Sequence, residues 1–158
     1  MERLEGYGEK IFKHYRLTKG DVLIIASNSG RNSVTIELAQ LAKEAGLTII
    51  GLTCMAHTIL SNSRHPSGKR LFEFSDIVLD NLGIAGDASI SIDDLDTKVG
   101  ATSTVIGAML INAAMVRTVE LLMQKGIKPE VFTSSNSDYG EEKNLGYYEK
   151  YRGEIPSL

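Results

Sequence analysis

Residues 21–32 read Asp-Val-Leu-Ile-Ile-Ala-Ser-Asn-Ser-Gly-Arg-Asn, and this stretch decides the fold. Its apolar, β-branched half, Val22–Ala26, is typical of a buried parallel strand, and a helical pattern follows at once from Ser33. The first N–H groups of a helix are unpaired and lie at the positive end of its dipole. The turn between strand and helix therefore favours an anion, phosphate above all, with side-chain donors from Ser27, Ser29 and Asn32.

The following residues complete a β-α-β unit. The pattern predicts a helix over Ser33–Ala45, ended by Gly46, and a second buried strand over Thr48–Thr53. Strands joined by a crossover helix run parallel, and the crossover is right-handed. A third short strand is expected over Asp76–Asp80. The helix presents five apolar side chains to the core: Val34, Ile36, Leu38, Leu41 and Ala42.

Four other segments carry weaker signals. Helical spacing predicts a helix within Met1–Arg16 and a short one within Gly68–Phe74. The segments Cys54–Ser67 and Asn81–Lys98 are expected to be irregular loops. The second of these loops is long and carries several aspartates, which indicates a binding or interface role.

The longest helical pattern covers Thr102–Lys125 and is apolar on nearly every side. Such a helix is either central to its domain or shared with a second subunit. The polar tail 130–158 contains a weakly helical stretch, Glu141–Tyr151. We therefore expect a single domain over residues 1–158, with its core in residues 21–125.

Composition sets the class of protein and its partners. The chain has 158 residues, of which 42% are hydrophobic, and a net charge of −3, which argues against nucleic-acid binding. The single cysteine, Cys54, excludes an internal disulfide. We find no signal-peptide pattern and no apolar run long enough to cross a bilayer, so a cytoplasmic protein without a membrane partner is expected.

Three segments together resemble the SIS (sugar isomerase) domain family. They are Ser-Asn-Ser-Gly-Arg-Asn at 27–32, Ser-Arg-His-Pro-Ser-Gly-Lys-Arg-Leu at 63–71 and Gly-Ala-Thr-Ser-Thr-Val at 100–105. They look most like uncharacterised bacterial SIS-domain proteins labelled phosphosugar or phosphoheptose isomerases. The likeness runs from about Asp21 to Lys125.

The resemblance implies a three-layer α/β/α sandwich with a flavodoxin-like parallel sheet that binds a phosphorylated sugar at the carboxyl ends of its strands. Open α/β sheets take ligands at that edge in general. By the resemblance, the phosphate-binding residues are Ser27, Asn28, Ser29, Gly30, Asn32, Thr53, Ser103 and Thr104. No cofactor and no metal are implied, and the partner is the sugar phosphate.

Two departures from the family pattern stand out. SIS domains begin with an earlier helix and a strand ending in a Gly-x-Gly-x-Ser-like turn, and no such pattern precedes Asp21. The domain is therefore expected to be incomplete at its N-terminus: either the sequence starts at an internal methionine, or the protein is a natural short form. Related proteins also often carry an acid where this chain has Lys98.

Candidate chemistry competes with simpler roles at each position. Moving a proton between adjacent sugar carbons needs a base, and His57, just after a strand end, is the best-placed candidate, although a surface histidine is the simpler interpretation. Ser103 and Thr104 either contact the ligand or cap their helix. The loop aspartates, Asp87, Asp93, Asp94 and Asp96, miss the spacing of a calcium loop, and a solvated loop explains them better.

Three functions remain open from the sequence. The first is a phosphosugar-binding domain that isomerises an aldose phosphate and a ketose phosphate. The second is a non-catalytic sensor that binds a phosphosugar and signals through an oligomer interface or a partner chain. The third is a non-binding fragment whose long helix, Thr102–Lys125, packs against a second copy. A homodimer or larger homo-oligomer is expected, because the chain lacks one flank of its sheet.

Overall fold

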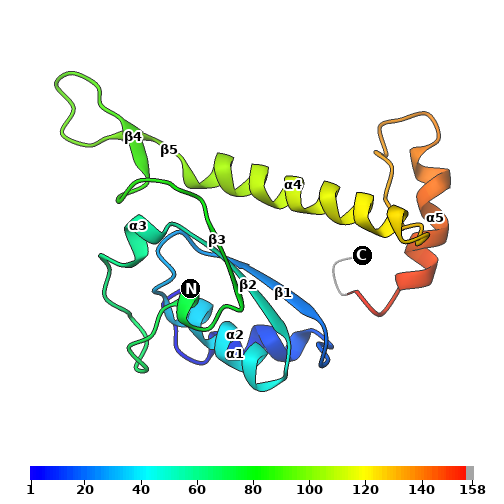
Figure 1. Ribbon diagram of the computed structural model, residues 1–158, viewed down its shortest axis with the longest axis horizontal. Coiled ribbons are helices and arrows are strands. Elements are labelled where there is room, and N and C mark those ends of the chain that lie inside the picture. The colour runs from blue at the N-terminus through cyan, green and yellow to red at the C-terminus, as the bar shows by residue number, and fades with distance from the viewer. Residues whose placement is uncertain (156–158) are drawn as a thin grey trace. The chain divides into compact units, whose positions relative to one another are not determined.

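The computed structural model describes residues 1–155, which form two compact units, Met1–Asn112 and the residues from Ala113 onward. Figure 1 labels the helices and strands of both units. The boundary lies inside the long helix α4, Ser103–Gln124. A single domain over residues 1–158 stays a prediction.

The first unit is built on a parallel sheet in the order β1-β2-β3 (Figure 1). Strands β1, Val22–Ala26, and β2, Thr48–Thr53, have the predicted bounds, and β3 covers Ile77–Asp80. Val22 pairs with Thr48, and Ile50 pairs with Ile77. The chain therefore has the predicted α/β fold with a parallel sheet.

Helix α2, Ser33–Glu44, covers one face of this sheet. Ile36, Ala39 and Ala42 are fully buried, and the last two pack in one core cluster with Ile25 and Ile49. Side chains alternate across a strand, so Leu52 lies on the face of β2 opposite to Ile49. On that face it contacts Gly107 of α4. The first turns of α4 thus form the third layer within the first unit.

Helix α1, Tyr7–His14, packs against α2 and is shorter than the predicted segment. Gly6 precedes α1 in a left-handed conformation with φ 76°. The Glu37 carboxylate accepts hydrogen bonds from the N–H groups of Gly6 at 2.6 Å and Gly8 at 2.7 Å. Glu37 therefore anchors the start of α1.

Two predicted loops contain regular structure. The segment Cys54–Ser67, expected to be irregular, holds α3, Met55–Thr58. The short helix expected within Gly68–Phe74 is a 3₁₀ turn, η1, at Leu71–Glu73. The long loop holds β4, Ala88–Ile90, which pairs antiparallel with β5, Val99–Ala101. The loop predictions were therefore wrong for α3 and β4, because a four-residue helix and a three-residue strand carry too little periodicity to be seen in a sequence.

Helix α4 is long and apolar enough to cross a membrane by length and composition alone. The prediction that the chain has no such apolar run was therefore wrong. Among the described residues of α4, only Gly107 is buried. The helix thus presents most of its apolar side chains rather than enclosing them in a core.

The second unit contains α5, Gly140–Tyr151, close to the predicted helical stretch. Its buried residue Asn144 accepts a hydrogen bond from the Thr133 N–H at 2.9 Å and donates one to the Thr133 carbonyl at 2.7 Å. The Phe132 ring packs on the rings of Tyr147 and Tyr148. These contacts hold the preceding segment against α5.

Candidate functional site

The loop Ser27–Asn32 is fixed through its carbonyl groups. The Asn28 carbonyl accepts from the Thr53 hydroxyl and the Cys54 N–H, each at 3.1 Å. The next three carbonyls accept from the Thr58 hydroxyl at 2.7 Å, the Leu71 N–H at 2.8 Å and the Arg64 N–H at 2.8 Å. All of these carbonyls therefore have partners in the segments that surround the loop.

The N–H groups of the same loop are left available. Within residues 1–155, those of Asn28, Ser29, Arg31 and Asn32 donate to no other group of the protein. Asn32 is the N-cap of α2 but makes no capping hydrogen bond, because its side-chain oxygen accepts from Arg64 Nη1 at 2.9 Å. In the first turn of α2 the Val34 N–H donates to the Glu2 carbonyl at 3.2 Å, whereas the four loop donors stay available, and a helix start with such donors favours an anion.

Gly30 gives the loop its turn. It has φ 57°, and a Cβ there would lie 3.1 Å from the Leu71 Cβ and 3.3 Å from the Thr58 hydroxyl oxygen. Only glycine adopts this conformation readily and fits this space. The shape of the loop therefore depends on Gly30.

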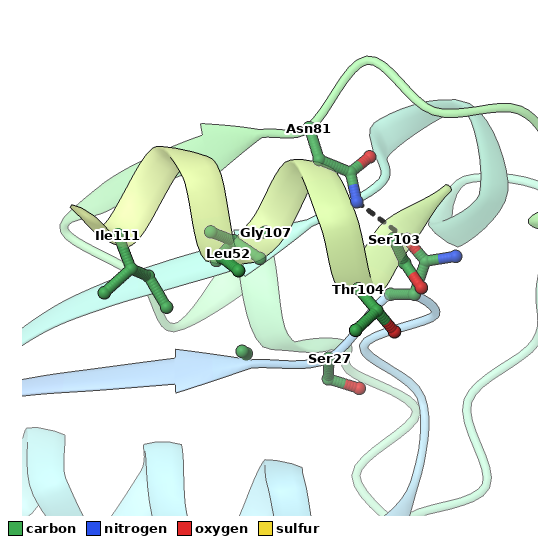
Figure 2. A pocket seen from close by; sticks show the side chains of 10 residues that line it. Ser27, Leu52, Asn81, Ser103, Thr104, Gly107 and Ile111 are labelled. Carbon is green, nitrogen blue, oxygen red and sulfur yellow. Dashed lines mark hydrogen bonds between the residues drawn. The ribbon is translucent and has the colours of Figure 1, made fainter. Parts of the chain in front are cut away.

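One pocket, of about 370 Å³, opens between the loop and the start of α4. Figure 2 shows Ser27 and Thr104 pointing toward one another across it. The Asn81 amide at the end of β3 donates to the Asn28 side-chain oxygen at 2.9 Å and so fixes one wall. We call it the helix pocket; its lining is Ala26, Ser27, Asn28, Leu52, Asn81, Ser103, Thr104, Gly107, Ala108 and Ile111.

The start of α4 is already occupied by a carboxylate. Asp87 accepts from the N–H and hydroxyl groups of Ser103 at 2.8 and 2.7 Å, and from both donors of Thr102 at 3.1 Å. The Ser103 hydroxyl, with these other donors, holds the pKa of the Asp87 carboxyl below its ordinary value. Asp87 is therefore a cap and not a solvated loop residue.

A second pocket, of about 430 Å³, shares the loop and lies beside two arginines. We call it the arginine pocket; its lining is Glu2, Ala26, Ser27, Asn28, Ser29, Arg31, Asn32, Thr35, His57 and Arg64. His57 on α3 is half-buried, and its Nδ1 accepts a hydrogen bond from the Gly86 N–H at 2.8 Å. A neutral His57 therefore carries its proton on Nε2.

The family described as "SIS domain" matches residues 1–54, which contain the loop and the uncapped start of α2. Residues 1–54 belong to a SIS domain. The β1-α2-β2 unit and the parallel sheet of the first unit are those of an α/β SIS fold.

Bacterial UPF0309 proteins are similar to this chain. Those of Shouchella clausii and Oceanobacillus iheyensis are each 43% identical over 155 residues, and one from Listeria monocytogenes is 36% identical over 154 residues. Each match covers 98% of this chain. The chain spans 63% of the length of the first two relatives and 66% of the third.

The structure divides the residues that the sequence assigned to the phosphate. Ser27, Asn28 and Ser29 are half-buried around the pockets, and Ser103 and Thr104 line the helix pocket. Thr53 is fully buried, and its hydroxyl supports the loop from behind. Asn32 lines the arginine pocket, with its side-chain oxygen engaged by Arg64.

Other titratable side chains lie away from both pockets. His65 bonds to the Ser67 hydroxyl through Nδ1 at 2.8 Å, outside the lining of both pockets. The side chains of Asp93, Asp94 and Asp96 are exposed. Within residues 1–155, no group of three or more His, Cys, Asp or Glu side chains could hold a metal ion.

Sequence reasoning did not select three supporting residues, Asn81, Arg64 and Thr58. The first two contact loop side chains, and Thr58 bonds to the Ser29 carbonyl. A signal existed for Asn81 alone, because it directly follows a strand that ends at the same sheet edge as the loop.

Proposed function

We propose that the SIS-domain chain binds a phosphorylated sugar, with the phosphate on the loop Ser27–Asn32. The observation that carries this proposal is the start of α2, where the carbonyls of Asn28–Arg31 are engaged while the N–H groups of Asn28, Ser29, Arg31 and Asn32 donate to no group within residues 1–155. A capping role for the loop hydroxyls is disfavoured, because no side chain caps α2. The SIS domain itself indicates phosphosugar binding.

Thermal unfolding of the chain with a panel of sugar phosphates and inorganic phosphate tests the proposal. A ligand that binds only the folded state stabilises it by about 2.7 kcal/mol at a hundred times its Kd. We expect a sugar phosphate to raise the Tm more than phosphate alone. Absence of any shift across the panel would contradict the proposal.

Ser29→Ala with Ser91→Ala as a matched control locates the site. Ser29 lines the arginine pocket, whereas Ser91 is exposed and lies outside both pockets. We expect the Ser29 variant to fold normally and to bind sugar phosphate at least about tenfold more weakly, the cost of one hydrogen bond to a charged group. Equal losses in the two variants would show that the loop is not the site.

We further propose that the bound sugar undergoes aldose–ketose isomerisation, in which a proton moves between adjacent carbons. His57 lines the arginine pocket with Ser27 and Ser29. Because its Nδ1 accepts from Gly86, its Nε2–H suits it to donate a proton or hydrogen bond to a sugar oxygen, not to abstract a proton from carbon. Turnover of sugar phosphates followed by NMR tests this reaction.

The hydrogen bond between Gly86 and His57 also supports a second candidate function, a non-catalytic phosphosugar sensor. The titratable side chains that line the two pockets are Glu2, Arg31, His57 and Arg64, and the tautomer of His57 leaves it without a base at Nε2. A sensor would bind the sugar phosphate without turnover. Binding with no isomerisation by the full-length protein would favour it over the enzyme.

Self-association through α4 is also proposed. Val105, Met109 and Val116 are 71%, 61% and 61% exposed, and spacings of four and seven put them on one face of the helix. The helix also contains Arg117 and Glu120, which favours a protein partner over a bilayer. We propose that a second copy covers this face and that the protein is cytoplasmic.

Light scattering after gel filtration tests this association. Met109→Lys is expected to give a monomer, because it places a charge in the apolar face, whereas Lys125→Met at the end of the helix should leave the oligomer intact. A monomeric wild type would contradict the proposal. Co-flotation of the wild type with lipid vesicles would indicate that a membrane covers the face instead.

A further inference from the structure

Two guanidinium groups lie beside the loop, and within residues 1–155 neither forms a salt bridge. Arg31 is half-buried, and its Nε is buried with no hydrogen-bond partner within residues 1–155. Arg64 Nη1 donates to the Asn32 side chain, and the Arg64 N–H donates to the Arg31 carbonyl. Both side chains line the arginine pocket. The fold thus brings together two arginines that are far apart in the sequence.

Positive charge accumulates at this place. Partial desolvation and the charges of Arg3 and Arg31 lower the pKa of Arg64, while Glu2 raises it. Among the described residues, none of these three arginines forms a salt bridge. Crowded cations without paired carboxylates destabilise a fold, so a site of this kind is usually built for an anion.

The loop and the arginines offer two separate sets of donors. The loop presents backbone N–H groups and serine hydroxyls at the start of α2. A guanidinium presents a planar fork of donors that matches a carboxylate or a phosphate oxygen pair. A pocket of about 430 Å³ also has room for a sugar with an anionic group at each end.

We propose that Arg31 and Arg64 bind a second anionic group of the ligand, so that the chain selects doubly anionic sugar phosphates. The second group is a carboxylate or a second phosphate. This inference rests on the proposed function, since it assumes that the loop holds the first phosphate.

Calorimetric titration of the full chain with three probes tests the inference. The probes are fructose 6-phosphate, fructose 1,6-bisphosphate and 6-phosphogluconate. We expect at least one of the two doubly anionic probes to bind about tenfold or more tightly than the monophosphate, as charge-assisted hydrogen bonds allow. Which of them binds better distinguishes a second phosphate from a carboxylate.

Arg31→Gln and Arg64→Gln separate the two sets of donors. Each is expected to reduce affinity for the tighter probe by about tenfold and to change affinity for the monophosphate by less than about twofold. Arg16→Gln removes the same charge from an exposed side chain outside both pockets and should change neither affinity. The Tm of each variant checks that it is folded.

Two results would overturn the inference while leaving the proposed function intact. In the first, the monophosphate binds, Ser29→Ala weakens it, and neither doubly anionic probe binds more tightly. In the second, the arginine variants weaken all probes equally, so that the arginines serve the loop phosphate. If no probe binds the wild-type chain, the proposed function and this inference both fail.

Discussion

Asp87 allows a sharp test of how the start of α4 is held. Its carboxylate accepts four hydrogen bonds from Thr102 and Ser103, at 2.7 to 3.1 Å. Asp87→Asn keeps one acceptor oxygen but removes the charge, so we expect a loss of about 1 kcal/mol in the free energy of unfolding. Asp87→Gly removes the cap and suits the φ of 71°, and should cost about 2 kcal/mol.

Asp94 supplies a matched control for both changes. It also has a positive φ, 63°, but its side chain is exposed and makes no hydrogen bond within the described residues. The same substitutions at Asp94 should change stability by less than about 0.5 kcal/mol. Urea denaturation followed by circular dichroism measures both series, and amide exchange at Ile106 reports on the first turn of α4.

The effect of pH gives a second readout. The folded pKa of Asp87 lies below its ordinary value of 3.8, so the stabilisation is complete above that pH and is lost as pH falls through the folded pKa. The difference between wild type and Asp87→Asn should therefore be constant near neutral pH and shrink below pH 3.8. Equal stability of the Asp87 and Asp94 variants at pH 7 would refute this account of the cap.

Three further predictions concern other contacts. Gly30→Ala should destabilise the chain by about 1–3 kcal/mol, because the new Cβ adds backbone strain and lies too close to Leu71 and Thr58. Gly126→Ala is the control: it has φ 75° and open space around it, so it should cost only the backbone strain. Urea denaturation compares the two variants. Asp76 bonds to Lys43 and the Ile49 N–H, which lower its pKa, so Asp76→Asn should lower the Tm near neutral pH and matter less as pH falls through the folded pKa. If the protein is an isomerase, His57→Gln should reduce kcat by about 10²-fold or more with little change in ligand affinity, and an unchanged kcat would exclude His57 from the reaction.

Local pattern predicted the central β-α-β unit well. Val22–Ala26 and Thr48–Thr53 are strands with those bounds, because each is a short β-branched run between turn residues. The helix between them begins at the predicted Ser33. The fold class followed, since parallel strands with a crossover helix leave few topologies open.

The site was less accessible to sequence reasoning, because its support comes from distant segments. The roles of Thr58, Arg64 and Asn81 depend on hydrogen bonds to a loop about 30 to 50 residues earlier, and no local pattern encodes such contacts. Asp87 was misjudged for the same reason, since its partners lie 15 and 16 residues later. The burial of the Arg31 Nε likewise depends on tertiary packing that no local pattern encodes.

The internal cap on α4 has a consequence for how a ligand would enter. The start of α4 borders the helix pocket and that of α2 borders the arginine pocket, but Asp87 already neutralises the start of α4. A negatively charged group approaching Ser103 therefore meets a carboxylate, whereas one approaching Ser29 meets unpaired N–H groups. The Asp87 carboxylate would thus fix the orientation of a bound sugar phosphate, with its phosphate at the loop. The reversed orientation, with the phosphate at Ser103, would be rejected by charge repulsion rather than by shape.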